Sequence, residues 1–367
     1  MKKSKPSTDR AVKEHNKNYV YLDVMRVVAI LAVLAIHTDA GSLYLKMPLG
    51  SISYTVCMFI SMFISFSPVI FFMISGALLL GKKETVGELW KKRILKMVIV
   101  LILVSLMYLL FDMLYDMEKA APAKFFASLY SEPRIAPLWY LYAYLAFLIT
   151  LPFLRGIASV IDEKTGLYFF VLCIVLRYVI PSVEKLFGNV YHMEGDLRWD
   201  WIMNTVVVFP VLGYWLHEKA DMRKIKRIIL PLAAADIAAL IYYTYLAYQK
   251  NVAQGINAVS DSFRGKINLF HAVCIFVLIR VICDGKISEN KKSISRILGE
   301  SVFGIYLIHG VFLDRISIIG RLRDSFFGCF NGITLLIPSV IWIAAVFALS
   351  FVSVRIAKKI PFLNRLI

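Results

Sequence analysis

The sequence predicts an all-α membrane protein, a polytopic bundle of about ten transmembrane helices. Hydrophobic residues make up 59% of the 367 residues and charged residues only 18%, whereas a soluble domain is about 45–50% apolar and about 25% charged. Apolar runs of roughly 20 residues recur along the whole chain, and each can cross a hydrocarbon core of about 30 Å as a helix. We therefore expect the excess apolar surface to face lipid.

The apolar runs define the predicted spans. The fifth, sixth and eighth runs are shorter than the others, so the number ten is approximate. Residues 1–18 are polar and basic and form a predicted cytoplasmic tail, and residues 19–367 form one predicted transmembrane domain. The predicted spans are 20–38, 57–80, 94–111, 138–154, 167–180, 202–216, 228–248, 268–283, 297–313 and 333–354.

The distribution of basic residues predicts the orientation in the membrane. The chain has 42 Lys and Arg against 25 Asp and Glu, a formal net charge of +17. In a soluble protein this charge would suggest nucleic-acid binding, but here the basic residues lie between spans. The loops on the side of the N-terminus hold 26 Lys and Arg and the opposite loops hold 12. By the positive-inside rule we expect a multi-pass plasma-membrane protein with both termini cytoplasmic and no nucleic-acid partner.

The five cysteines predict neither a disulfide framework nor a metal site. Their number is odd, no two form a Cys-x-x-Cys pair, and none lies near a histidine at ligand spacing. We expect them to be residues of the membrane core, and we expect no metal cofactor.

The first span carries three ionisable residues, which are costly in hydrocarbon and are therefore functional candidates. Arg26 and His37 are eleven residues apart, which places them on one face of a helix with about 16 Å between them along the axis. Asp23 lies close to that face, within reach of Arg26. Two other interpretations stay open: Asp23 and Arg26 could be an interfacial ion pair, and His37 could be a snorkelling residue near the membrane surface.

This first span resembles the opening signature of membrane-bound acyltransferase family 3, in which Leu-Asp-x-x-Arg is followed by an apolar run and a histidine. Lys96 stands where this family usually has a second arginine, which keeps the charge but loses the bidentate fork. Four further segments resemble motifs of the same family in the same order. They are Phe-Met-Ile-Ser-Gly-Ala-Leu-Leu at 72–79, Trp-Lys-Lys-Arg-Ile-Leu-Lys at 90–96, Leu-Trp-Tyr-Leu at 138–141 and Phe-Gly-Ile-Tyr-Leu-Ile-His at 303–309.

The resemblance implies an integral membrane acyltransferase that moves an acetyl or other short acyl group from acyl-CoA to a hydroxyl of a cell-envelope glycan or related acceptor. An imidazole suits this reaction, because its ordinary pKa near 6.5 lets it take a hydroxyl proton at neutral pH. The implied catalytic residues are His37, Arg26 and Asp23. The implied donor-binding residues are Arg93, Lys96 and Lys92. The implied acceptor-binding residues are Trp139, Tyr140, Tyr306, His309 and Ser75.

Alternatives remain for the function and for several residues. A bundle of ten helices with buried charges also suits a transporter or permease for a small solute or envelope precursor, although the internal repeat typical of many transporters is not apparent. A non-catalytic scaffolding subunit is a weaker possibility. His309 could be structural, and Trp139 and Tyr140 could be an interfacial aromatic belt. Asp236 is expected to pair with another buried polar group. The residues without a predicted role are Arg177, His271 and Arg280.

Overall fold

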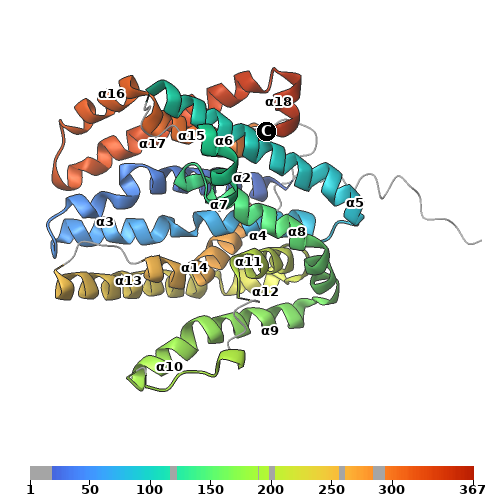
Figure 1. Ribbon diagram of the computed structural model, residues 1–367. Coiled ribbons are helices and arrows are strands. Elements are labelled where there is room, and N and C mark those ends of the chain that lie inside the picture. Colours follow the sequence, from blue (N-terminus) through green and yellow to red (C-terminus); the bar gives the residue numbers. More distant parts are fainter. Residues whose placement is uncertain (1–18, 116–121, 189, 198–202, 256–260, 284–293) are drawn as a thin grey trace, which may run out of the picture.

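The computed structural model describes residues 19–115, 122–188, 190–197, 203–255, 261–283 and 294–367, which form helices and contain no strand. The helices run side by side in one bundle (Figure 1). The predicted tail, residues 1–18, lies outside the described residues. The α-helices are α2 Val20–His37, α3 Ile52–Phe63, α4 Ser67–Leu79, α5 Val86–Leu89, α6 Leu95–Tyr115, α7 Phe125–Ser131, α8 Trp139–Val160, α9 Glu163–Ile174, α10 Ile180–Leu186, α11 Thr205–Tyr214, α12 Met222–Arg227, α13 Ile229–Gln254, α14 Asp261–Ile282, α15 Ile294–Gly310, α16 Ser317–Phe327, α17 Leu336–Ala357 and α18 Pro361–Leu366.

Short 3-10 and π-helical turns join some of these helices into longer rods. The structure describes eight rods that are long and apolar enough to span a membrane, together with a shorter apolar helix at Ile267–Ile282. Eight of the ten predicted spans fall on the long rods. The span predicted at 268–283 falls on the shorter helix. The sixth falls on α11 and its π-helical extension η9, Trp215–Lys219. The predicted fold class is therefore confirmed, although the fifth span, Glu163–Leu186, is longer than predicted.

Local sequence signals explain where several helices begin and end. Thr85 caps α5 in a reciprocal capping box with Glu88, and Ser51 accepts a hydrogen bond from a backbone N–H of α3, which satisfies donors that a helix start leaves unpaired. Gly255 ends α13 with a φ of 62°, a left-handed conformation that glycine adopts without a steric penalty. Pro68 lies in the first turn of α4, after the 3-10 turn that interrupts the second rod.

The first helix occupies the centre of the bundle. Helix α2 packs against α4, α14, α15 and α17, and its side chains contribute to the main hydrophobic core. The contact between α4 and α11 is especially close, because a Cβ atom on Gly76 would lie 1.9 Å from the Pro210 carbonyl oxygen and one on Gly213 would lie 2.1 Å from that of Met73. Small residues permit such close helix packing in membranes. By contrast, α9 and α10 stand apart at the edge of the bundle (Figure 1).

One buried polar network lies away from this centre and joins three helices. Asp236 on α13 lies 2.7 Å from Nδ1 of His271 on α14, and the other ring nitrogen of His271 lies 2.8 Å from the Phe63 carbonyl. That carbonyl belongs to the end of α3, where the second rod is interrupted. The prediction that Asp236 pairs with another buried polar group is confirmed.

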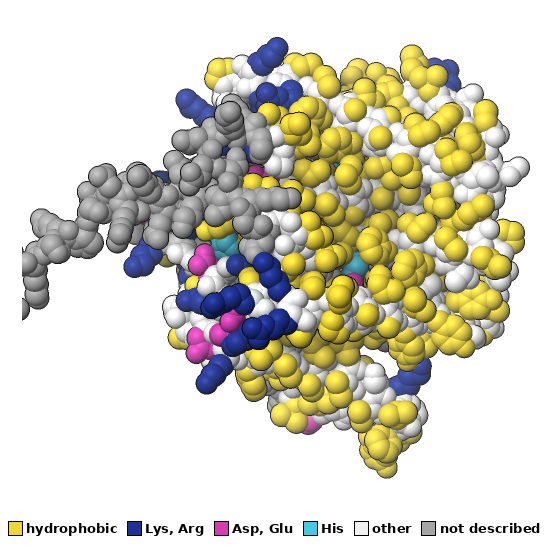
Figure 2. Space-filling model, turned by 180° about the vertical axis from the view of Figure 1, so that it is seen from behind, with side chains coloured by type: hydrophobic (Ala, Val, Ile, Leu, Met, Phe, Trp, Pro, Cys, Tyr) yellow, Lys and Arg dark blue, Asp and Glu magenta, His cyan; other side chains and the backbone are white. Residues whose placement is uncertain are grey.

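The surface separates apolar sides from charged ends. Figure 2 shows a broad hydrophobic face, with many of the visible charged side chains gathered at one edge. This distribution is the one expected of a bundle that lies in lipid with its ends in water. The chain is a multi-pass membrane protein. The bundle has two ends: the α5 end, where α4 ends and α5 begins, and the α16 end, on the opposite side of the bundle (Figure 1).

Candidate active site

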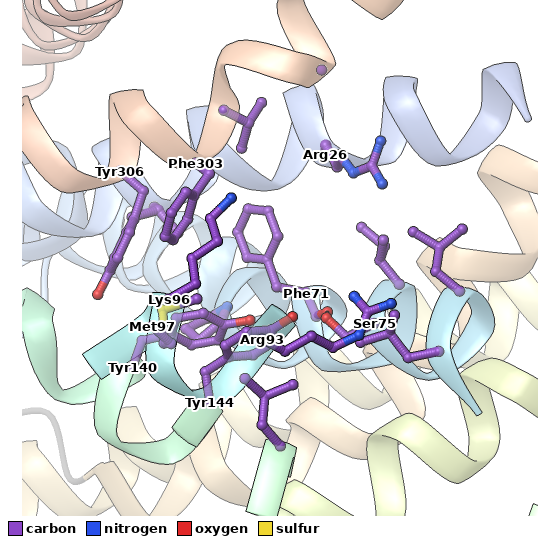
Figure 3. Close-up of a pocket in the computed structure, with 18 of the residues that line it drawn as sticks. Arg26, Phe71, Ser75, Arg93, Lys96, Met97, Tyr140, Tyr144, Phe303 and Tyr306 are labelled. Atoms are coloured by element: carbon purple, nitrogen blue, oxygen red, sulfur yellow. The ribbon is translucent and has the colours of Figure 1, made fainter. Parts of the chain in front are cut away.

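A cavity of about 480 Å³ lies within the bundle between α2, α4, α6, α8 and α15. Figure 3 shows Arg26, Phe303 and Tyr306 on one side of the cavity and Ser75, Arg93, Tyr140 and Tyr144 on the other. Its lining includes most of the residues that the sequence motifs single out. These are Arg26, His37, Ser75, Lys92, Arg93, Lys96, Trp139, Tyr140 and Tyr306.

Helix α2 contributes Arg26 and His37 to the same cavity, as their spacing predicts. Asp23 does not line the cavity. Its carboxylate accepts a hydrogen bond from Arg26 Nη1 at 2.5 Å, and it packs where Gly299 of α15 leaves room. Asp23 therefore neutralises Arg26 and orients its guanidinium, a contact that the three-residue spacing also predicts.

A second histidine lies beside His37. The ring centroids of His37 and His309 are 5.5 Å apart, and His309 is fully buried and lies outside the cavity lining. Nδ1 of His309 lies 2.6 Å from the Tyr306 carbonyl oxygen, whereas Nε2 has no hydrogen-bond partner among the described residues. The role of His309 in acceptor binding stays a prediction, and this position behind His37 favours a different role.

The α5 end of the cavity is basic, but its basic side chains differ in whether a carboxylate already binds them. Glu84 accepts two hydrogen bonds from Arg93, at 3.0 and 2.6 Å, and one from Arg155 at 2.8 Å. The guanidinium fork of Arg93 is thus already occupied by a carboxylate. Hydrogen bonds from Arg93 lower the pKa of Glu84 to about 2, so Glu84 is ionised at neutral pH. Lys92 is paired with Glu88 at the surface.

Two lysines near this ion-pair cluster also line the cavity. Lys96 has neither a hydrogen bond nor an ion pair among the described residues, and it enters the cavity from α6 (Figure 3). Lys82 lies in the connection between α4 and α5, where burial and the neighbouring Arg93 lower the pKa of its ammonium group. Several cations in one partly buried space favour the entry of an anion. Lys96 is therefore the cation best placed to meet an incoming phosphate.

Aromatic side chains form the middle and the α16 end of the cavity. The hydroxyl of Tyr306 donates to the Pro137 carbonyl at 2.6 Å, which fixes this ring across the gap between α15 and the start of α8. Tyr140 and Tyr144 stack at a centroid distance of 5.9 Å, and both line the cavity together with Ser75. The lining of the cavity is therefore largely aromatic and aliphatic between its basic end and His37.

Sequence reasoning missed several residues of this site. Tyr144 follows Tyr140 by four residues and so lies on the same helix face, a signal that could have identified it. Phe71 directly precedes the 72–79 motif and Phe303 is the first residue of the 303–309 motif, so helix spacing could have identified both in the same way. Glu84 had no such signal, because it lies in a loop nine residues before Arg93 and meets it only through the fold. Within the described residues there is no group of three or more potential metal ligands.

Comparison with known families identifies one match. The chain matches the family model described as an acyltransferase domain over residues 19–357. This range includes every residue that lines the cavity. No curated protein and no solved structure matches the chain.

Proposed function

Because the chain belongs to acyltransferase family 3 and is a multi-pass membrane protein, we propose that it transfers an acetyl or other short acyl group from cytosolic acyl-CoA to a hydroxyl of a cell-envelope glycan or related acceptor. One observation supports this proposal above all. A single cavity is lined by basic residues at its α5 end and by His37 farther along. A donor with an anionic head and a long thioester arm needs both features in one space.

The donor enters from the α5 end in this proposal. Its phosphates meet Lys96 and Lys82, which line the cavity. Neither lysine has a carboxylate as close as Glu84 is to Arg93. Charge-assisted hydrogen bonds to phosphate are stronger than neutral ones. Arg93 can bind a phosphate only after it shares or gives up its hydrogen bonds to Glu84. The pantetheine arm then follows the apolar part of the cavity past Tyr144 and Phe303.

Arg26 lies along this path, about 16 Å from His37 by helix geometry. Asp23 holds its guanidinium at 2.5 Å and leaves other N–H donors for the cavity. We assign Arg26 to the polar groups of the donor arm rather than to the reacting carbonyl, because that carbonyl must reach His37. Asp23 acts by orienting Arg26.

The acceptor hydroxyl approaches His37 from the α16 end, past Trp139, Tyr140 and Tyr306. Aromatic rings offer apolar faces for the flat sides of a sugar. His37 takes the hydroxyl proton as the oxygen bonds to the thioester carbonyl carbon. The carbon–sulfur bond then breaks, the thiolate receives the proton from His37, and the acyl ester and free thiol leave. General-base catalysis of this kind contributes about 10²–10⁴-fold.

The charge distribution along the chain supports a direction of transfer. The loops at the α5 end are the basic ones and face the cytoplasm by the positive-inside rule. The donor is then bound from the cytoplasm and the acceptor from outside. In this orientation both termini are cytoplasmic.

A reconstitution experiment tests the proposal. Purified protein in vesicles is given acetyl-CoA labelled in the acetyl group, together with hydroxyl acceptors of the cell envelope, and the acceptors are then analysed for label. We expect label in an ester linkage, dependent on protein and on acyl-CoA. Solute uptake that proceeds without acyl-CoA, with no labelled acceptor, would instead support the transporter alternative.

A further inference from the structure

The position of His309 behind His37 points to a role beyond the function proposed above, on which this inference rests. His309 is fully buried in α15 and does not line the cavity. It is therefore not placed to touch either substrate. Its ring lies 5.5 Å from that of His37, centroid to centroid, with an angle of 38° between the ring planes.

The protonation of His309 follows from its hydrogen bond. Nδ1 lies 2.6 Å from the carbonyl oxygen of Tyr306, and a carbonyl oxygen can only accept. Nδ1 therefore carries the proton, and Nε2 of the neutral ring holds a lone pair. That Nε2 atom is buried and has no hydrogen-bond partner among the described residues. A buried acceptor without a donor is costly.

Among the neighbouring rings, His37 is the one with a donor to offer. Tyr306 also lies close, with a centroid distance of 6.0 Å from His309, but its hydroxyl is committed to the Pro137 carbonyl. His37 has no hydrogen bond to either ring nitrogen within the described part of the chain. One of the two must carry a proton in the neutral ring.

The structure shows no hydrogen bond between the two rings, so the rings must rotate to meet. We propose that His309 is a positioning residue: after such a rotation Nε2 of His309 accepts the N–H of His37 and thereby keeps the other nitrogen of His37 unprotonated and directed into the cavity. A base with a fixed tautomer presents its lone pair to the acceptor in every molecule, whereas an unrestrained imidazole divides between two tautomers. The third group that orients a catalytic histidine elsewhere is often a carboxylate or carbonyl. Here the neutral imidazole of His309 takes the place of that group, and it adds no charge to the membrane interior.

Three variants test this role through turnover per folded molecule. His309→Phe keeps a planar ring and removes the acceptor, and we expect kcat to fall about 10–100-fold with little change in the KM for acyl-CoA. His309→Gln restores an acceptor oxygen, and we expect it to recover part of the loss. In a His37→Gln background, His309→Phe should cause no further loss, because His309 acts only through His37.

A spectroscopic measurement separates positioning from a structural role. In protein with ¹⁵N-labelled histidine, the ring nitrogens of His37, assigned by their disappearance in His37→Gln, should report one tautomer. In His309→Phe they should report a mixture. The ionisable groups that line the cavity with His37 are Arg26, Lys82, Lys92, Arg93, Lys96, Tyr140, Tyr144 and Tyr306, and none of them changes in this comparison.

The outcomes distinguish this inference from the proposed function. If His37→Gln abolishes transfer but His309→Phe leaves kcat and the tautomer of His37 unchanged, the positioning role of His309 is wrong. His37 then remains the proposed base. An equal loss from His309→Phe in both backgrounds would likewise overturn it. If His37→Gln itself turns over normally, the proposed base is wrong, whatever His309 does.

Discussion

Two histidines of this membrane bundle differ in how the protein engages them. His271 is fully buried, and both of its ring nitrogens have partners, the Asp236 carboxylate at 2.7 Å and the Phe63 carbonyl at 2.8 Å. His37 lines the cavity, and the structure gives neither of its nitrogens a hydrogen bond within the described residues. An imidazole with both nitrogens engaged holds helices together, whereas one that keeps a free nitrogen at a cavity wall can take a proton from a ligand, even if its other nitrogen meets His309.

The same contrast applies to the cations of the cavity. Arg93 donates two hydrogen bonds to Glu84, while Lys96 reaches the cavity without a partner in the described chain. Being ionisable inside a membrane helix is therefore not enough to make a residue functional. The difference lies in whether its polar atoms are already satisfied by the protein. Four predictions test this distinction.

The largest effect is expected at His37. His37→Gln keeps most of the size and hydrogen-bonding capacity but cannot act as a base near neutral pH. We expect transfer per folded molecule to fall at least ~10²-fold, the lower end of what a general base contributes, with acyl-CoA binding retained. Rates of label transfer and an equilibrium binding assay measure both quantities. Near-normal turnover would mean that His37 is not the general base.

His271 should show the reverse pattern. His271→Leu leaves the Asp236 carboxyl without its partner in the membrane interior, and breaking a buried pair in this way typically costs about 3–5 kcal/mol. We expect a lower unfolding temperature in detergent, with turnover per folded molecule nearly unchanged. If this variant does not fold, the milder His271→Gln replaces it. Loss of turnover at normal stability would contradict a structural role.

The cations provide the third comparison. Lys96→Met removes one unengaged charge, and the loss of one charge-assisted phosphate contact, roughly 1.5–3 kcal/mol, should weaken acyl-CoA binding about 10–150-fold. Lys92→Met is the matched control. Because Lys92 lies at the surface in an ion pair with Glu88, its removal should change binding by less than about 1 kcal/mol. Equal effects from both would exclude a special role for Lys96.

The smallest effect concerns Glu84 and pH. Its pKa is lowered to about 2 in the folded protein, so the ionised carboxylate stabilises the fold above its ordinary pKa near 4.5. This contribution is lost as the pH falls from about 4.5 toward 2. We expect about 1 kcal/mol, because partial solvation reduces the full linkage value. Thermal unfolding at several pH values should show this dependence in the wild type and much less of it in Glu84→Gln.

The sequence predicted the fold and one side of the site well, for physical reasons. Apolar length specifies spans, and a helix of known pitch places Arg26 and His37 on one face. The ion pair between Asp23 and Arg26 follows from the same local geometry. Contacts between distant segments had no comparable signal. Glu84 reaches Arg93 from a loop, and which histidine is engaged depends on how α3, α13 and α14 meet.

The single cavity has an electrical consequence for the proposed reaction. If the leaving sulfur and His37 share one enclosed space, the proton taken from the acceptor can pass to the departing thiolate without entering the solution on either side. Each side of the membrane then keeps its charge, because a neutral alcohol becomes a neutral ester outside and the thioester becomes a thiol inside. A charge that crossed would cost or gain about 2.3 kcal/mol per 100 mV. Transfer by this route should therefore proceed at the same rate in energised and de-energised membranes.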